Sequence, residues 1–117
     1  MSSRKPKWKF RLKHIIESIN RIEQYTEGFN LEQFTCDPKT FDAVVRNLIV
    51  IGEAARQVPQ EIINAYPKLP WTEMRALRNV LTHEYDRVGV GIIWDTIRND
   101  LPPLTPALEL ILQRAEE

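Results

Sequence analysis

The chain has 117 residues, which is enough for one hydrophobic core but not for two. Hydrophobic residues make up 43% and charged residues 27%, a mix that is typical of globular proteins. Sixteen basic residues balance sixteen acidic ones, so the net charge does not indicate a polyanionic partner. Cys36 is the single cysteine of the sequence, which excludes an internal disulfide and a cysteine-based metal site.

The basic residues are concentrated at the N-terminus, where six of them precede the first acidic residue, Glu17. We interpret residues 1–7 as a basic tail and residues 8–117 as one helical domain. Such a tail either contacts nucleic-acid phosphates or is simply solvated, and both interpretations stay open. No signal peptide fits the N-terminus, and the longest apolar run, Leu48 to Ile51, is too short to span a membrane. We therefore expect a cytoplasmic protein. The six basic residues are Arg4, Lys5, Lys7, Lys9, Arg11 and Lys13.

Apolar residues recur at steps of three and four from about Trp8 to Glu27, which predicts an amphipathic helix. Gly28 and Asn30 end this helix, and a short connection follows in which Phe34 contacts the core. The apolar face consists of Leu12, Ile15, Ile16, Ile19 and Ile22.

Asp37 and Pro38 predict the start of a second helix, with Asp37 as N-cap and proline at the first helical position. This helix should end before Pro59. Gly52 lies inside it, where glycine costs roughly 1 kcal/mol relative to alanine, so we expect a close helix–helix contact there. The predicted buried residues are Phe41, Val44, Val45, Leu48, Ile51 and Ala55.

Three further helices complete the prediction. After one or two turns at Gln60 to Tyr66, a helix begins near Trp71 or Thr72 and reaches at least His83. A fourth follows the turn at Gly89 and Gly91, and Thr105-Pro106 starts the last. No stretch shows sustained period-two alternation, so the fold class is all-α, an antiparallel four- to five-helix bundle. The inward residues of the last two helices are Ile92, Ile93, Trp94, Ile97, Leu108, Ile111 and Leu112.

The helix that reaches His83 carries a polar face suited to phosphate chemistry. At about 100° per residue, Arg78, Asn79 and His83 lie opposite the apolar stripe, together with Arg75 and Thr82. Arginine binds phosphate bidentately, and histidine exchanges protons near neutral pH. Arg78 and His83 are nevertheless about 140° apart, so in one chain they converge only if Arg78 bends round or the helix end distorts. The apolar stripe consists of Met74, Leu77, Val80 and Leu81.

At these residues the sequence resembles the HEPN superfamily and, within it, the HepT-like toxin ribonucleases, whose motif is Arg-x4-His-x-Tyr. Arg78, His83 and Tyr85 fit this spacing without a gap, and Asn79 is the expected polar neighbour. The resemblance covers nearly the whole chain from Trp8 onward. It includes an Ile-Gly-Glu-Ala segment at 51–54, a Pro-Trp pair at 70–71 and a Leu-Pro-x-Leu segment at 101–104.

The resemblance implies a HEPN-type bundle that acts as a metal-independent endoribonuclease without a cofactor. It implies Arg78 and His83 as catalytic residues and Asn79 as a supporting residue that orients His83 or binds a phosphate oxygen. It also implies a homodimer in which two motifs face one another across a cleft. Cleavage through the 2′-hydroxyl of RNA needs one group to accept a proton and another to donate one, and a dimer supplies two copies of His83.

The resemblance gives Tyr85 a separate role. The partner of HepT-like toxins is an MntA-type nucleotidyltransferase antitoxin, which adds AMP to the motif tyrosine and silences the toxin. An added adenylate brings negative charge and bulk, both of which oppose RNA binding. The alternative for Tyr85 is a half-buried aromatic residue at a helix end.

Other residues carry weaker expectations. Glu53 either approaches the cleft or is solvated, Trp71 and Trp94 belong to the core rather than to a base-stacking surface, and His14 is remote from the motif. No glycine-rich nucleotide-binding pattern is present. A rival function also stays open, in which the chain is a non-catalytic helical scaffold for a nucleotidyltransferase.

Overall fold

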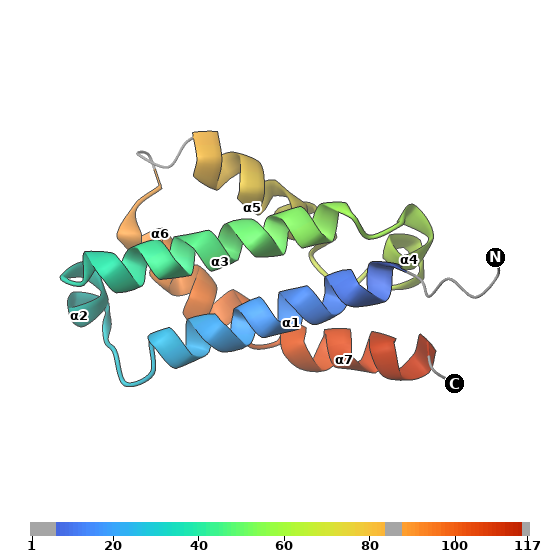
Figure 1. Ribbon diagram of the computed structural model, residues 1–117, viewed down its shortest axis with the longest axis horizontal. Helices are drawn as coiled ribbons and strands as arrows, with labels where there is room; N and C mark the ends of the chain where they lie inside the picture. Colours follow the sequence, from blue (N-terminus) through green and yellow to red (C-terminus); the bar gives the residue numbers. More distant parts are fainter. Residues whose placement is uncertain (1–6, 84–87, 116–117) are drawn as a thin grey trace.

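The computed structural model describes residues 7–83 and 88–115. Within these ranges all regular structure is helical, as the all-α prediction requires. Figure 1 shows the helices α1, α3 and α7 running lengthwise beside one another, with α5 inclined above α3. The elements are α1 (Lys7–Tyr25), α2 (Leu31–Thr35), α3 (Pro38–Arg56), α4 (Gln60–Ala65), α5 (Trp71–His83), α6 (Val90–Asp95), a π-helical segment (Thr96–Asp100) and α7 (Leu104–Ala115).

The core is built around α1 and α3, and the other long helices add buried residues to it. Helices α1 and α3 run antiparallel and pack along most of their lengths, and α7 packs against α1 (Figure 1). Their apolar stripes have the three- and four-residue spacing of one helix face, so each stripe becomes buried when the helices meet. The predicted faces of α1, α3 and α7 are confirmed as buried in all but two positions, Ile16 and Phe41, which are half-buried. Fully buried members include Leu12, Ile15, Ile19, Ile22, Val44, Ile51, Ala55 and Leu108.

The start and the end of α3 are as predicted. Asp37 is the N-cap: its Oδ1 accepts a hydrogen bond from the backbone N–H of Thr40 at 3.1 Å, and its Oδ2 accepts one from the Thr40 hydroxyl at 2.9 Å. These bonds favour the ionised carboxyl group and hold the pKa of Asp37 below its usual 3.8. Pro38 occupies the first turn, and the helix ends at Arg56, before Pro59.

The connection after α1 is more ordered than predicted. Gly28 adopts a positive φ of 78°, which glycine tolerates, but residues 31–35 form the short helix α2. A capping box begins this helix, because Asn30 Oδ1 accepts from the N–H of Gln33 and Gln33 Oε1 accepts from the N–H of Asn30. Phe34 is fully buried, as expected, and its ring lies 5.2 Å from that of Trp94. Helix α2 therefore seals the end of the core.

Two predictions for the C-terminal third are wrong. Ile92 was expected to face inward, but its side chain is 62% exposed, because the first turn of α6 turns that position to solvent while Ile93 is buried. Thr105 was expected to cap the last helix, but α7 already begins at Leu104. The hydroxyl oxygen of Thr105 is buried without a hydrogen-bond partner among the described residues, so it does not act as a cap.

Five long helical segments agree with the expected bundle when α6 and the following π-helical turn are counted as one; α2 and α4 are additional short helices. Helix α1 begins at Lys7, within the predicted tail, whose other residues lie outside the described part of the chain. None of the helices in the described ranges is both long and apolar enough to cross a lipid bilayer.

Candidate active site

Helix α5 carries the motif and is anchored at its first turn. Trp71 is 4% exposed, and its indole Nε1–H donates to the backbone carbonyl of Tyr66 at 2.8 Å. Met74, one turn further, is also buried, so the prediction of core positions holds here. Beyond this anchor fewer side chains of α5 are buried.

The second half of α5 is exposed. Leu81 is its buried residue, whereas Val80 is 37% exposed and Leu77 is half-buried, so the predicted four-residue apolar stripe is only partly buried. Helix α5 packs mainly against α3, so its side chains that face away from α3 stay exposed. The polar residues of the motif therefore stand on a helix end that projects from the bundle (Figure 1).

Gly52 makes the crossing of α3 and α5 possible. A Cβ atom at this position would lie 2.5 Å from the backbone nitrogen of Arg78 and 3.1 Å from its Cβ. No side chain fits that space, so the predicted close contact at Gly52 is confirmed. The residue of α5 at this contact is Arg78, the first residue of the motif. The contact therefore fixes the position of the Arg78 backbone relative to α3.

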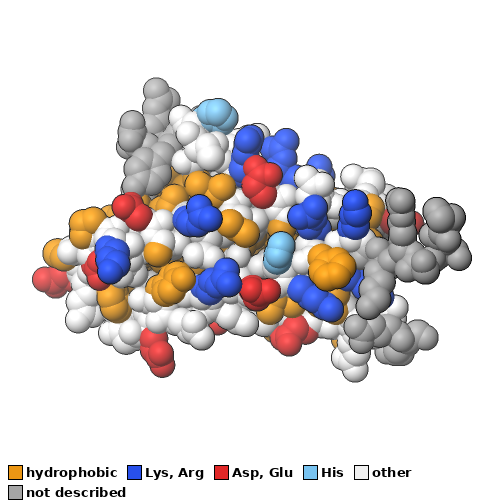
Figure 2. Space-filling view, in the orientation of Figure 1, with side chains coloured by type: hydrophobic (Ala, Val, Ile, Leu, Met, Phe, Trp, Pro, Cys, Tyr) orange, Lys and Arg blue, Asp and Glu red, His pale blue; other side chains and the backbone are white. Residues whose placement is uncertain are grey.

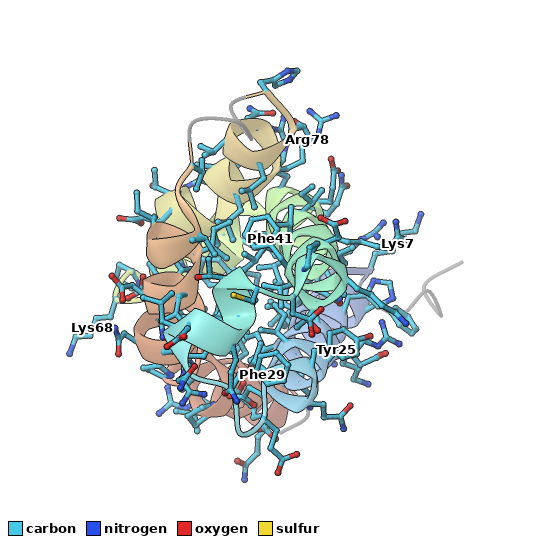
Figure 3. The ribbon with its side chains drawn as sticks, turned by 90° about the vertical axis from the view of Figure 1, so that its left-hand side faces the viewer. Lys7, Tyr25, Phe29, Phe41, Lys68 and Arg78 are labelled. Carbon is cyan, nitrogen blue, oxygen red and sulfur yellow. The ribbon has the colours of Figure 1, made fainter. Side chains whose placement is uncertain are left out.

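Arg78 is held by two neighbours. Its Nε lies 2.6 Å from Oε1 of Glu53 on α3, forming an ion pair, and its Nη1 donates to Oδ1 of Asn79 at 3.1 Å. Among the described residues, Nη2 donates to no protein group. Both partners of the ion pair are partly solvent-accessible, at 41% for Arg78 and 49% for Glu53. In Figure 3 the Arg78 side chain projects at the edge of the molecule, away from the interior where Phe41 lies. The guanidinium group is thus oriented yet accessible to a phosphate.

Asn79 and His83 are not bonded to each other. The Asn79 side chain accepts a hydrogen bond from Arg78 instead. Its supporting role in the reaction, orienting His83 or binding a phosphate oxygen, stays a prediction. The helix is regular through His83, with the Thr82 hydroxyl donating to the carbonyl of Arg78 at 2.7 Å, and His83 is exposed at the last turn. Because the helix end is not distorted, Arg78 and His83 keep their separation of about 140° around the axis.

A shallow groove of about 250 Å³ lies between α1 and α3, beside the ion pair. Arg11 and His14 line it from α1, and Glu53 and Gln57 line it from α3. His14 was expected to be remote from the motif, but it shares this groove with the residue that pairs with Arg78. Figure 2 shows Lys and Arg side chains gathered on this face, together with both pale-blue histidines.

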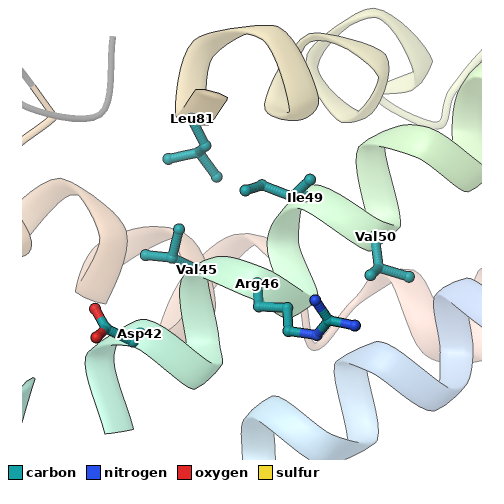
Figure 4. A pocket seen from close by; sticks show the side chains of 6 residues that line it. All are labelled: Asp42, Val45, Arg46, Ile49, Val50 and Leu81. Carbon is teal, nitrogen blue, oxygen red and sulfur yellow. The ribbon is translucent and has the colours of Figure 1, made fainter. Parts of the chain in front are cut away.

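A second groove, of about 390 Å³, lies under the projecting end of α5. Its lining is mostly apolar, with Ile49 and Val50 of α3 on one side and Leu81 of α5 on the other, and Arg46 at its edge (Figure 4). Ile49 and Val50 also line the first groove, so the two grooves share these residues. An apolar surface therefore lies next to the motif.

Tyr85 lies outside the described residues. Within the described ranges, no three His, Cys, Asp or Glu side chains form a group able to hold a metal ion. The sequence left Glu53 either near the cleft or solvated and did not predict its ion pair with Arg78. Its position directly after Gly52, the predicted contact point, places it near the crossing of α3 and α5.

An all-helical bundle that presents Arg-x4-His on an exposed helix end has the form of a HEPN-type domain. The sequence model of the family described as "Ribonuclease HepT-like" matches residues 15–111. The chain therefore belongs to the HepT-like ribonuclease family. It is 40% identical to a probable ribonuclease HepT of Thermococcus cleftensis over 84% of this chain and 89% of that protein. It is 38% identical to a putative RNase of Methanocaldococcus jannaschii (87% and 84%) and 37% identical to one of Caldanaerobacter subterraneus (88% and 92%). No solved structure matches the chain.

Proposed function

We propose that this protein is a metal-independent endoribonuclease toxin of a HEPN and nucleotidyltransferase toxin–antitoxin pair. The observation that carries the proposal is the exposed end of α5, where Arg78 is oriented by two neighbours and His83 is accessible to substrate. The names of the relatives support an RNA substrate. A guanidinium group can bind the phosphate, and imidazole groups can transfer the protons of this reaction.

In the proposed reaction the 2′-oxygen of RNA attacks the adjacent phosphorus, and the bond to the 5′-oxygen breaks. One imidazole accepts the proton of the 2′-hydroxyl, and another donates a proton to the leaving 5′-oxygen. Arg78 binds the phosphate and stabilises the charge that develops on its oxygens. The products are a 2′,3′-cyclic phosphate and a 5′-hydroxyl, so the step needs no water and no metal.

The test is cleavage of single-stranded RNA by the purified chain in the presence of EDTA. We expect cleavage that EDTA does not reduce, with product ends that carry cyclic phosphate in mass spectrometry. Cleavage that stops with EDTA and returns with added Mg²⁺ would contradict metal independence. Absence of any RNA cleavage, at protein concentrations that favour a dimer, would contradict the enzyme itself.

The proposed enzyme is a homodimer. Two histidine roles require two imidazoles near one phosphate, and the regular helix in one chain keeps even Arg78 and His83 apart. The apolar groove formed by Ile49, Val50 and Leu81 beside the motif offers a surface that a second copy would bury.

Sedimentation equilibrium tests the dimer. We expect Val50→Glu to give a folded monomer that no longer cleaves RNA, because a charge in the apolar groove opposes association. Ile92→Glu is the matched control, since Ile92 is 62% exposed on α6, and it should stay dimeric and active. A wild-type chain that is monomeric at activity-assay concentrations would overturn the composite site.

We further propose that an MntA-type nucleotidyltransferase silences the toxin by adding AMP to Tyr85. The support is the motif spacing, in which a tyrosine follows His83 by two residues. Intact mass after incubation with that antitoxin and ATP tests the modification. An adenylate-sized increase in the peptide that contains Tyr85, absent in Tyr85→Phe, is expected; a mass that does not change would reject it.

The rival function is a non-catalytic scaffold for the nucleotidyltransferase. A neighbouring reading frame with a Gly-Ser-x10-Asp-x-Asp type motif would fit either function. Expression without that neighbour separates them: the enzyme should be toxic and His83→Ala should not, whereas for a scaffold the two should be equally harmless.

A further inference from the structure

Glu53 connects the motif helix to the body of the protein. We propose that Glu53 is a positioning residue for the reaction: it fixes the guanidinium group of Arg78 through Nε, so that the end formed by Nη1 and Nη2 is presented to the RNA phosphate. The proposal rests on the ribonuclease function proposed above.

The geometry follows from the shape of the guanidinium group. It can grip a phosphate with two parallel N–H groups, either along the side formed by Nε and Nη2 or across the end formed by Nη1 and Nη2. Oε1 of Glu53 lies 2.6 Å from Nε in an ion pair, so its negative charge stands beside Nε and disfavours a phosphate there. Asn79 accepts one hydrogen bond from Nη1, and Nη2 makes no bond to a described protein group. The end of the guanidinium group is therefore the part offered to substrate.

The Ile-Gly-Glu-Ala segment at 51–54 builds this arrangement. Ile51 is fully buried, Gly52 lets the backbone of α5 rest on α3 at Arg78, and Glu53 comes next in the chain beside that contact. The backbone of Arg78 and the carboxylate of Glu53 are thus placed by the same crossing.

The pair has little effect on folding. Exposed ion pairs contribute about 0.2–1 kcal/mol to stability, and both members here are more than one-third exposed. A contact that adds so little stability can still decide a rate, because small misplacement of a reacting group lowers it steeply. Variants of Glu53 should therefore fold, and a change in their kcat should reflect the reaction step rather than unfolding.

The charge of Glu53 gives the proposal a distinctive signature. Glu53 lines the groove beside Arg11 and His14, and its negative charge repels any RNA phosphate that binds near Arg78. Removing it should favour RNA binding while it disturbs the orientation of Arg78. A residue that simply held substrate would do the opposite and weaken binding.

The experiment compares Glu53→Ala and Glu53→Gln with the wild-type protein, using a single-stranded RNA oligonucleotide and its 2′-O-methyl form for binding. For Glu53→Ala we expect kcat to fall at least about tenfold while KM and the Kd of the methylated RNA stay equal or decrease. Glu53→Gln should be intermediate, because its amide oxygen still faces Nε but its charge is lost. Glu17→Ala is the matched control, since it removes the exposed ion pair with Arg21 on α1, at 3.3 Å, and kcat should stay within about twofold.

Two results would overturn the proposal: a kcat of Glu53→Ala that matches the control, or a raised KM with an unchanged kcat. An equal loss of kcat in the Arg78→Lys background would also contradict it, because the effect must pass through Arg78.

The Nε–H NMR signal of Arg78, assigned with Arg78→Lys, tests the pairing without activity. It should shift in Glu53→Ala but not in Glu17→Ala. An unshifted signal refutes the pairing even if RNA is cleaved, and a wild-type protein that cleaves no RNA refutes the enzyme even if the signal shifts.

Discussion

Two ion pairs of similar exposure lie in different parts of the molecule. Glu17 and Arg21 pair at 3.3 Å within α1, four residues apart on one helix, whereas Glu53 and Arg78 pair at 2.6 Å between α3 and α5. The first joins residues that the helix already places, so it adds only about 0.3–0.5 kcal/mol. The second fixes a side chain relative to another helix. The same kind of contact thus adds a little stability within α1, whereas between α3 and α5 it holds the Arg78 side chain in position.

The largest expected difference between the two regions concerns the arginines. Arg78→Ala should reduce kcat/KM for RNA cleavage by at least about a hundredfold, because a donor to the developing phosphate charge is lost. Arg21→Ala should change it by less than about twofold. Thermal melting should show both variants folded, since both side chains are well exposed. Equal activity of the two variants would remove the distinction.

A methyl group at the crossing should disturb both folding and activity. Gly52→Ala places a Cβ 2.5 Å from the backbone nitrogen of Arg78, so α5 must shift. We expect a loss of about 1–3 kcal/mol in the free energy of unfolding and at least a tenfold loss in kcat. Gly91→Ala is the control in α6, because nothing lies within 4 Å of its Cβ position, and it should be neutral or slightly stabilising. Urea denaturation and RNA cleavage measure both effects.

The anchored first turn of α5 should matter for stability alone. Trp71→Phe removes the donor to the Tyr66 carbonyl and should lower the free energy of unfolding by about 1–3 kcal/mol. At temperatures where the variant is fully folded, kcat should equal that of wild type, because the motif end of the helix is retained. A loss of kcat in the folded variant would show that the two halves of α5 are not separable.

The smallest expected effect is a pH dependence at the start of α3. The folded-state pKa of Asp37 is lowered by the bonds from Thr40, so its stabilising effect is present above the unfolded value and disappears as pH falls through the folded pKa. The difference in Tm between wild type and Asp37→Ala should therefore be larger at about pH 7 than at about pH 3. A difference that grows on acidification would contradict this account of the N-cap.

Most of the scaffold could be predicted because its signals are local. The apolar spacing of α1, the Asp37-Pro38 start and the close contact at Gly52 each follow from neighbouring residues. Thr105-Pro106 looked equally good as a start, but the chain enters α7 at Leu104, because burial of Leu104 overrides the local cap. The capping box at Asn30 was a local signal that went unused.

The site was less predictable because it depends on contacts between helices. The motif predicts Arg78 and His83 as site residues, but no spacing rule shows that Glu53 pairs with Arg78 or that Asn79 bonds Arg78 rather than His83. The exposure of Val80 also depends on how far α5 extends beyond α3. Such facts arise from the crossing geometry, which sequence periodicity does not encode.

The central claim is that two copies of the end of α5 form one catalytic site. The most direct measurement is the RNA-cleavage rate of a heterodimer with one wild-type and one His83→Ala subunit, purified through two different affinity tags. A composite site needs both imidazoles, so the heterodimer should be nearly as inactive as the His83→Ala homodimer. Half of the wild-type rate would show that each chain acts alone, and an unchanged rate would remove His83 from the reaction.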